Sequence, residues 1–149
     1  MKPISVSRVI PAPAQAIFDL LADPKMHPVI DGGGTVQSPR GDNPERLSLG
    51  AKFGMNMKLG APYPILNTVV EFEEGTRIGW CHFAKNVWRY ELEPVDGGTC
   101  VTETFDPTGA PFGIATGVRL LGFGRRNRPA MEKTLERIEQ HLVGASGPS

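Results

Sequence analysis

The chain has 149 residues, of which 40% are apolar, and its 16 basic and 16 acidic side chains cancel to a formal net charge of zero. This length suits one domain with its own core, and the balanced charge argues against the broad basic surface that nucleic-acid binding requires. We therefore expect one domain over residues 1–143, a flexible tail over residues 144–149, and no DNA or RNA partner.

The sequence also bears on location, metals and cofactors. Its N-terminal residues lack the apolar run of a secretory signal or a membrane span, which predicts a cytoplasmic protein without stable membrane insertion. Cys81 and Cys100 lack the number and spacing of a disulfide framework or zinc site, so we expect reduced thiols on separate strands. His27 has no second ligand at metal spacing and is interpreted as a loop residue. These spacings predict no metal site, and because no phosphate-loop motif occurs we also expect no cofactor.

The first part of the chain predicts a strand, a helix and a long turn region. Residues 4–10 alternate apolar and polar side chains over most of their length, as a half-buried strand does. Residues 14–22 carry an apolar stripe at helical spacing, and Asp23-Pro24 ends this helix because a residue before proline avoids the helical region. Residues 25–43 are rich in turn formers, with one more helical turn and one short strand among them.

The middle of the chain predicts a series of strands separated by turns. Alternation marks them at residues 51–59, 65–73, 77–83 and 87–93, with a turn over residues 60–64. On the last three of these strands we expect the following side chains to share one face: Leu66, Thr68, Val70 and Phe72; then Ile78, Trp80 and His82; then Trp88, Tyr90 and Leu92. Two of these faces are aromatic.

The Asp-Gly-Gly-Thr sequence at residues 96–99 predicts a hairpin with a two-residue glycine loop. Counting outward from this loop places Leu92 opposite Glu103, so that Glu103 points inward together with Tyr90. A loop one residue longer would instead turn Thr102 inward and make Glu103 a surface charge.

The C-terminal part predicts a long amphipathic helix. Residues 108–124 are glycine-rich and partly apolar, which fits either a loosely formed helix or a mobile lid. From Pro129 onward the pattern is firmly helical, with Met131, Leu135 and Ile138 on one face. The order strand, helix, several strands, long helix predicts an α+β fold in which a curved antiparallel sheet wraps around the terminal helix. A cavity between the two is then expected.

Several segments together resemble the SRPBCC superfamily, the START-like, helix-grip proteins, and in particular its polyketide cyclase/dehydrase and lipid-transport type. The resemblance covers nearly the whole chain and rests on residues 10–13 (IPAP), 17–24 (IFDLLADP), Trp80, 88–94 (WRYELEP) and 97–104 (GGTCVTET). It implies a helix-grip fold with a deep hydrophobic pocket for lipids, sterols, polyketides or other ring compounds. Because members range from carriers to enzymes, it implies the fold more firmly than the activity.

Our leading hypothesis is a protein that binds or carries a hydrophobic or amphipathic small molecule, as a monomer or homodimer. Aromatic rings and thioethers offer large, adaptable contact areas, although both also fill ordinary cores. The expected cavity-lining residues are Phe53, Met55, Val70, Trp80, Trp88, Tyr90, Phe105, Phe112 and Met131. The glycine-rich stretch around Phe112 would gate the entrance.

The alternative is a cyclase, aromatase or dehydratase that acts on a polyketide-like substrate. His82, Tyr90 and Glu103 are the ionisable residues that we place inside the cavity, where they could exchange protons with a substrate. The same residues could equally form a satisfied polar network that fixes the sheet. A third possibility, a protein-interaction module, needs an exposed apolar sheet face, whereas the outward positions of the predicted strands are largely polar.

Overall fold

The computed structural model describes residues 3–81, 86–108 and 123–144. In this part of the chain, seven strands form one antiparallel sheet in the order β1-β7-β6-β5-β4-β3-β2. The strands are β1 (Ile4–Ile10), β2 (Val36–Arg40), β3 (Lys52–Leu59), β4 (Ala61–Glu73), β5 (Arg77–Cys81), β6 (Val87–Val95) and β7 (Gly98–Asp106). The helices are α1 (Ala14–Leu21), the 3₁₀ turn η1 (Pro24–Met26), α2 (His27–Ile30), α4 (Phe123–Glu139) and the π-helical turn η2 (Gln140–Gly144).

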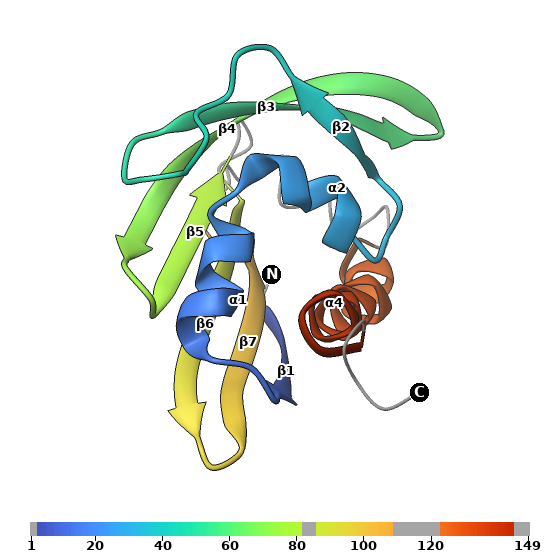
Figure 1. Cartoon of the computed structure of the whole chain (residues 1–149). Helices are drawn as coiled ribbons and strands as arrows, with labels where there is room; N and C mark the ends of the chain where they lie inside the picture. The colour runs from blue at the N-terminus through green and yellow to red at the C-terminus, as the bar shows by residue number, and fades with distance from the viewer. Residues whose placement is uncertain (1–2, 82–85, 109–122, 145–149) are drawn as a thin grey trace.

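The sheet is strongly curled, and α4 lies on its inner side beside the edge strand β1 (Figure 1). The short helices α1 and α2 connect β1 to β2 and cover the rest of the inner side. This arrangement confirms the predicted α+β, helix-grip fold. None of the helices in the described ranges is both long and apolar enough to cross a membrane.

The core forms where α1 and α4 press their apolar faces onto the sheet. On α1 the buried side chains include Ile17, Phe18 and Leu21, at the spacing that the sequence predicts. On α4 the predicted face is also confirmed, since Met131, Leu135 and Ile138 are at most 1% exposed. The helix begins at Phe123, upstream of the expected start at Pro129, so this proline lies within the helix.

The strand β4 differs from its prediction in its start and in the side that it turns inward. It begins at Ala61, directly after a tight turn at Gly60, so residues 61–64 are strand and not turn. Pro62 and Pro64 are tolerated there because β5 pairs with β4 only from Thr68 onward, which leaves the proline side of the strand without a ladder to interrupt.

A β-bulge at Val70 explains why the predicted inward face of β4 is wrong for part of the strand. The pairing with β5 skips this residue, since Val69 lies opposite Trp80 and Glu71 lies opposite Gly79. One extra residue reverses the alternation, so the predicted face is correct for Phe72 but wrong for the residues before the bulge. Val70 is 42% exposed on the outer side, and Val69 is buried in its place.

The β6–β7 hairpin keeps the predicted inward face in a different register. Its two loop residues are Asp96 and Gly97, not two glycines, so that Leu92 lies opposite Val101 and Tyr90 lies opposite Glu103. The pairing is therefore shifted by two residues, and an even shift leaves each side chain on its predicted face. Glu103 accordingly points inward, and the longer loop that would expose it is not formed.

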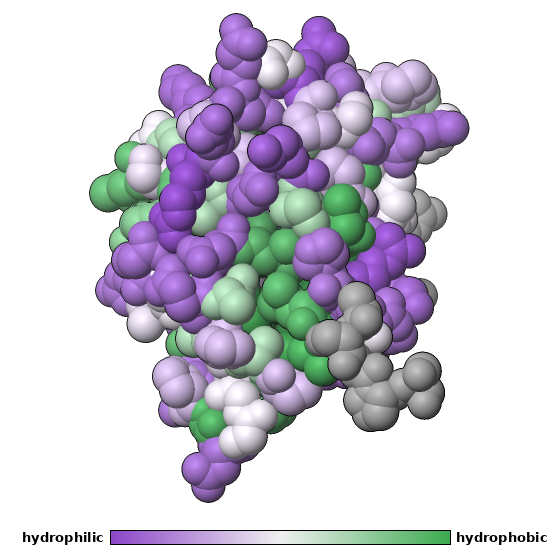
Figure 2. Space-filling model, in the orientation of Figure 1, coloured by the Kyte–Doolittle hydropathy of each residue, from purple (hydrophilic) through white to green (hydrophobic). Residues whose placement is uncertain are grey.

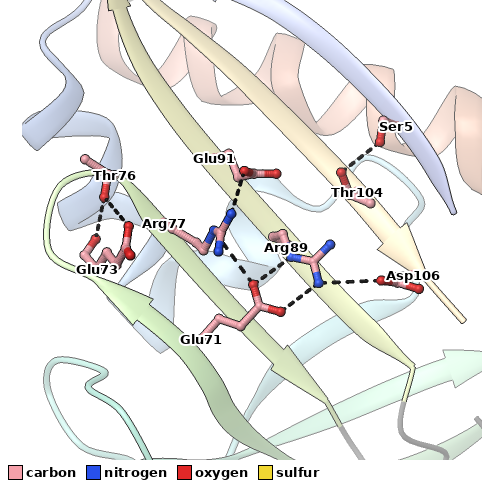
Figure 3. A network of polar contacts seen from close by, with 9 residues as sticks. All are labelled: Ser5, Glu71, Glu73, Thr76, Arg77, Arg89, Glu91, Thr104 and Asp106. Atoms are coloured by element: carbon pink, nitrogen blue, oxygen red, sulfur yellow. Dashed lines mark hydrogen bonds and ion pairs between the residues drawn. The ribbon is translucent and has the colours of Figure 1, made fainter. Parts of the chain in front are cut away.

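The outer side of the sheet carries a network of ion pairs across β4, β5, β6 and β7 (Figure 3). Arg89 binds both carboxylate oxygens of Glu71, at 2.6 and 2.7 Å, and lies 3.5 Å from Asp106. Arg77 pairs with Glu91 at 3.0 Å. The hydrogen bonds from Arg89 lower the pKa of Glu71. This charged face supports the expectation that the sheet does not offer an apolar docking surface there.

Candidate functional site

A cavity of about 260 Å³ lies between α2, the inner side of the sheet and α4. Its walls are mainly apolar and aromatic, with Met55 and Met57 from β3, Trp80 from β5, Trp88 from β6 and Met131 from α4. On the face of the molecule seen in Figure 2, apolar residues gather at the centre and hydrophilic residues surround them. Apolar residues are therefore exposed at the centre of this face and are surrounded by hydrophilic ones (Figure 2).

Aromatic rings form a connected wall along one side of the cavity. Trp80 stacks on the His27 ring, with centroids 4.6 Å apart and planes at 23°, and lies 5.7 Å from the Tyr90 ring. Behind this layer, Phe53 packs edge-on against Trp80 at 5.6 Å. Ring contacts of this kind fix the orientation of the wall.

A buried carboxyl group faces the cavity from β7. Glu103 is 2% exposed and interacts with the Tyr90 hydroxyl on the neighbouring strand, while its Oε1 has no hydrogen-bond partner among the described residues. Burial raises the pKa of Glu103 well above its ordinary value, and burial together with the nearby Glu103 raises the pKa of Tyr90. Burial therefore favours the neutral, protonated form of both groups.

His27 contributes a second polar group, which the sequence analysis wrongly placed in a loop. It begins α2, is 7% exposed and lines the cavity. Its Nε2–H donates to the Leu21 carbonyl over 2.8 Å, and burial lowers its pKa, which favours the neutral ring with the lone pair on Nδ1. The usable signal was the i, i+3 spacing of His27 and Ile30 after Pro24, which marks the inner face of a further helix.

The segment of residues 31–36 lines the cavity and is hydrogen-bonded to α4. The Asp31 carboxylate accepts hydrogen bonds from the backbone N–H groups of Gly33 and Val36, at 3.3 and 2.9 Å. The Gly32 N–H donates to Thr134 Oγ1 at 2.9 Å. A Cβ at Gly32 would lie 2.5 Å from Lys133 Cβ, so only glycine allows this close approach to α4. The contacts hold the Asp31 carboxylate at the cavity wall.

The predicted ligand-binding and catalytic residues fall into four groups. Met55, Trp80, Trp88, Tyr90, Glu103 and Met131 all line the cavity. Phe53 and Phe105 are buried in the layer behind it, where Phe105 packs on Trp88. Val70 is wrongly placed, for the reason given above, and His82 and Phe112 lie outside the described residues.

Further polar groups reach the cavity that sequence reasoning did not select. Asn67 is 4% exposed on β4 and was expected on the outer face, and Thr134 lies on α4 among the apolar core positions. Neither a turn motif nor a charge pattern marks them, because their inward placement depends on the bulge and on the docking of α4. Within the described ranges, no three histidine, cysteine or acidic side chains group as metal ligands.

Replacing Glu103 by glutamine should stabilise the protein at neutral pH. Because the folded-state pKa of Glu103 is raised, its contribution to stability is fully present below its unfolded pKa and is lost as the pH rises toward the folded value. The amide that E103Q introduces does not ionise, so we expect this variant to match the parent near pH 4 and to become increasingly more stable than the parent as the pH rises. Urea denaturation at several pH values measures this; a gain that is equal at all pH values would contradict it.

Comparison with known proteins supports the same fold. Residues 1–143 match the family model described as polyketide cyclase / dehydrase and lipid transport. The uncharacterized protein Rv0088 of Mycobacterium tuberculosis is 37% identical over 147 residues, which cover 94% of this chain and 64% of that protein. The chain thus spans just under two thirds of this relative.

Solved structures at low sequence identity share the architecture. Protein Ms6760 from Mycobacterium smegmatis has a TM-score of 0.71 at 17% identity, covering 97% of this chain and 92% of its own. The Aha1 dimer from Colwellia psychrerythraea has a TM-score of 0.67 at 13% identity, covering 95% and 96%. These identities establish only the fold. With the family model matching almost its full length, the chain belongs to the polyketide cyclase / dehydrase and lipid transport family.

Proposed function

We propose that the protein binds a compact hydrophobic or amphipathic small molecule in the cavity between the sheet and α4. The observation that carries this proposal is the make-up of the walls, in which aromatic rings and methionines surround a few converging polar groups, among them Glu103 and Asn67. Small-molecule sites in proteins typically combine a mostly apolar lining with a few polar groups of this kind. Family membership supports ligand binding in general and names no particular ligand.

The cavity volume limits the size of the ligand. At about 260 Å³, the cavity is slightly smaller than the roughly 300–1,000 Å³ usual for drug-sized ligands. A molecule of one or two rings, or one longer chain whose end leaves through the mouth, fits this volume better than a fully enclosed sterol. We therefore favour a compact ring compound.

Tryptophan fluorescence offers a direct test because the chain has two tryptophans, Trp80 and Trp88, and both line the cavity. Native mass spectrometry of gently purified protein should show a bound molecule, and adding a suitable one- or two-ring compound should shift or quench the fluorescence saturably. The single variants W80F and W88F assign the signal. A clean unliganded mass, with no response to a panel of lipids and ring compounds, would contradict the proposal.

The second candidate is an enzyme of the cyclase or dehydratase type. The observation that favours it is that a buried carboxyl with a raised pKa, Glu103, and a buried imidazole with a lowered pKa, His27, line one mainly apolar cavity. Such a pair can donate a proton to a carbonyl oxygen and take one from a neighbouring carbon, as enolisation requires. Incubation with polyketide-like ketones, followed by product analysis, should then show turnover that E103Q and H27F abolish while ligand binding persists.

A further inference from the structure

Glu103 lines the cavity, and one oxygen of its carboxyl group has no hydrogen-bond partner among the described residues. The side chain is 2% exposed, and the oxygen without a partner there is Oε1. The Tyr90 hydroxyl belongs to the opposing residue of β6 and already interacts with the carboxyl. Across β7 from this pair, the residue opposite Glu103 on β1 is Val6, which is buried and offers no side-chain hydrogen bond. Buried polar atoms are normally hydrogen-bonded, so the cavity that Glu103 lines is where we seek the partner of Oε1.

The charges around this oxygen disfavour an anionic partner. Asp31 lines the same cavity, and its negative charge acts on both Tyr90 and Glu103. Burial lowers the pKa of His27, from α2, which favours its neutral form. An anionic group entering the cavity would lose its hydration and would be repelled by the Asp31 carboxylate. A neutral oxygen avoids both costs and can still take the hydrogen bond.

We propose that Glu103 is a specificity-determining residue that hydrogen-bonds to an uncharged carbonyl or hydroxyl oxygen on the ring compound bound in the cavity, and that the site rejects carboxylate ligands of the same shape. This inference rests on the proposed binding function and adds to it the chemistry of the ligand's polar end. The aromatic wall of Trp80 and Trp88 holds the rings, and the protonated carboxyl of Glu103 donates to the ligand oxygen.

Three ligands with the same two-ring skeleton test the inference: tetralin, which lacks a polar group, α-tetralone, which adds a carbonyl, and tetralin-1-carboxylate, which adds a negative charge. Isothermal titration calorimetry at about pH 7 should show α-tetralone binding about 5- to 10-fold more tightly than tetralin, the factor expected for one hydrogen bond. The carboxylate should bind more weakly than tetralin.

Two variants separate the hydrogen bond from the shape of the site. E103Q keeps a donor on a side chain of similar size, so the preference for α-tetralone should persist. E103M removes the donor and keeps the length, so the preference for α-tetralone over tetralin should disappear. Because each preference is a ratio measured within one folded variant, a change in overall stability does not imitate it.

The outcomes distinguish this inference from the proposed function. Equal binding of tetralin and α-tetralone to the parent protein, or tightest binding of the carboxylate, overturns the role of Glu103 while ligand binding stands. If none of the three ligands binds and native mass spectrometry shows no adduct, the proposed function falls and this inference falls with it.

Discussion

Replacing Met57 by tryptophan should weaken ligand binding about 100-fold or more, equivalent to roughly 2.7 kcal/mol. Met57 lies on β3 between Val36 of β2 and Tyr63 of β4, lines the cavity and is half-buried. An indole ring at this position takes up space that the ligand needs. Because the position is not fully enclosed, we expect a stability cost of about 1–3 kcal/mol, the range for overpacking, and a folded variant.

The matched control is tryptophan at the next residue, Lys58, which is exposed on β3. It introduces the same ring on the same strand outside the cavity, so K58W should bind ligand as the parent does. Calorimetric titration with a ligand identified by mass spectrometry, together with thermal unfolding of both variants, measures the difference. If M57W binds as tightly as K58W, the ligand does not occupy this cavity.

The fold could be predicted from the sequence because its signals are local and repeated. On β3, strict alternation marks the face that is buried along the strand. On α4, an apolar stripe that includes Met131, Leu135 and Ile138 marks the face that is buried along the helix. The inward direction of Glu103 could be predicted for a related reason. Although the hairpin register was wrong by two residues, an even error preserves the side on which each residue lies.

The bulge in β4 could not be predicted from the local pattern. Residues 65–73 contain apolar side chains at both odd and even positions, so two alternations fit, and the skipped pairing at Val70 combines them. The choice depends on how β4 meets Trp80 of β5, which is a contact between distant residues. The same choice brings Asn67 to the cavity, where sequence reasoning had placed an outward amide.

The polar part of the site was only half predicted for a similar reason. Tyr90 and Glu103 lie on strongly alternating strands, and their meeting follows from pairing. His27 lies in a turn-rich region, where its burial depends on the Leu21 carbonyl and on stacking with Trp80. The spacing of His27 and Ile30 indicates a helix, but the stacking on Trp80 joins residues far apart in the sequence and leaves no local pattern.

Replacing Phe18 by alanine should cost about 3–5 kcal/mol of folding free energy, the usual range for removing a fully buried phenylalanine ring. Phe18 is 0% exposed on α1 and packs edge-on against Phe72 of β4, with ring centroids 5.4 Å apart. The Arg46 guanidinium lies 5.5 Å from the centre of its ring. The alanine variant loses these contacts and leaves a cavity between α1 and the sheet.

Urea denaturation measures this loss, and V9A serves as the control because Val9 is 53% exposed on β1 and should change stability by less than about 0.5 kcal/mol. A loss below about 1 kcal/mol in F18A would mean that α1 does not pack on β4 in solution. The consequence would extend to the site, since α1 ends at Leu21, whose carbonyl holds the His27 ring against Trp80. Loosening α1 should therefore also weaken ligand binding, although Phe18 does not line the cavity.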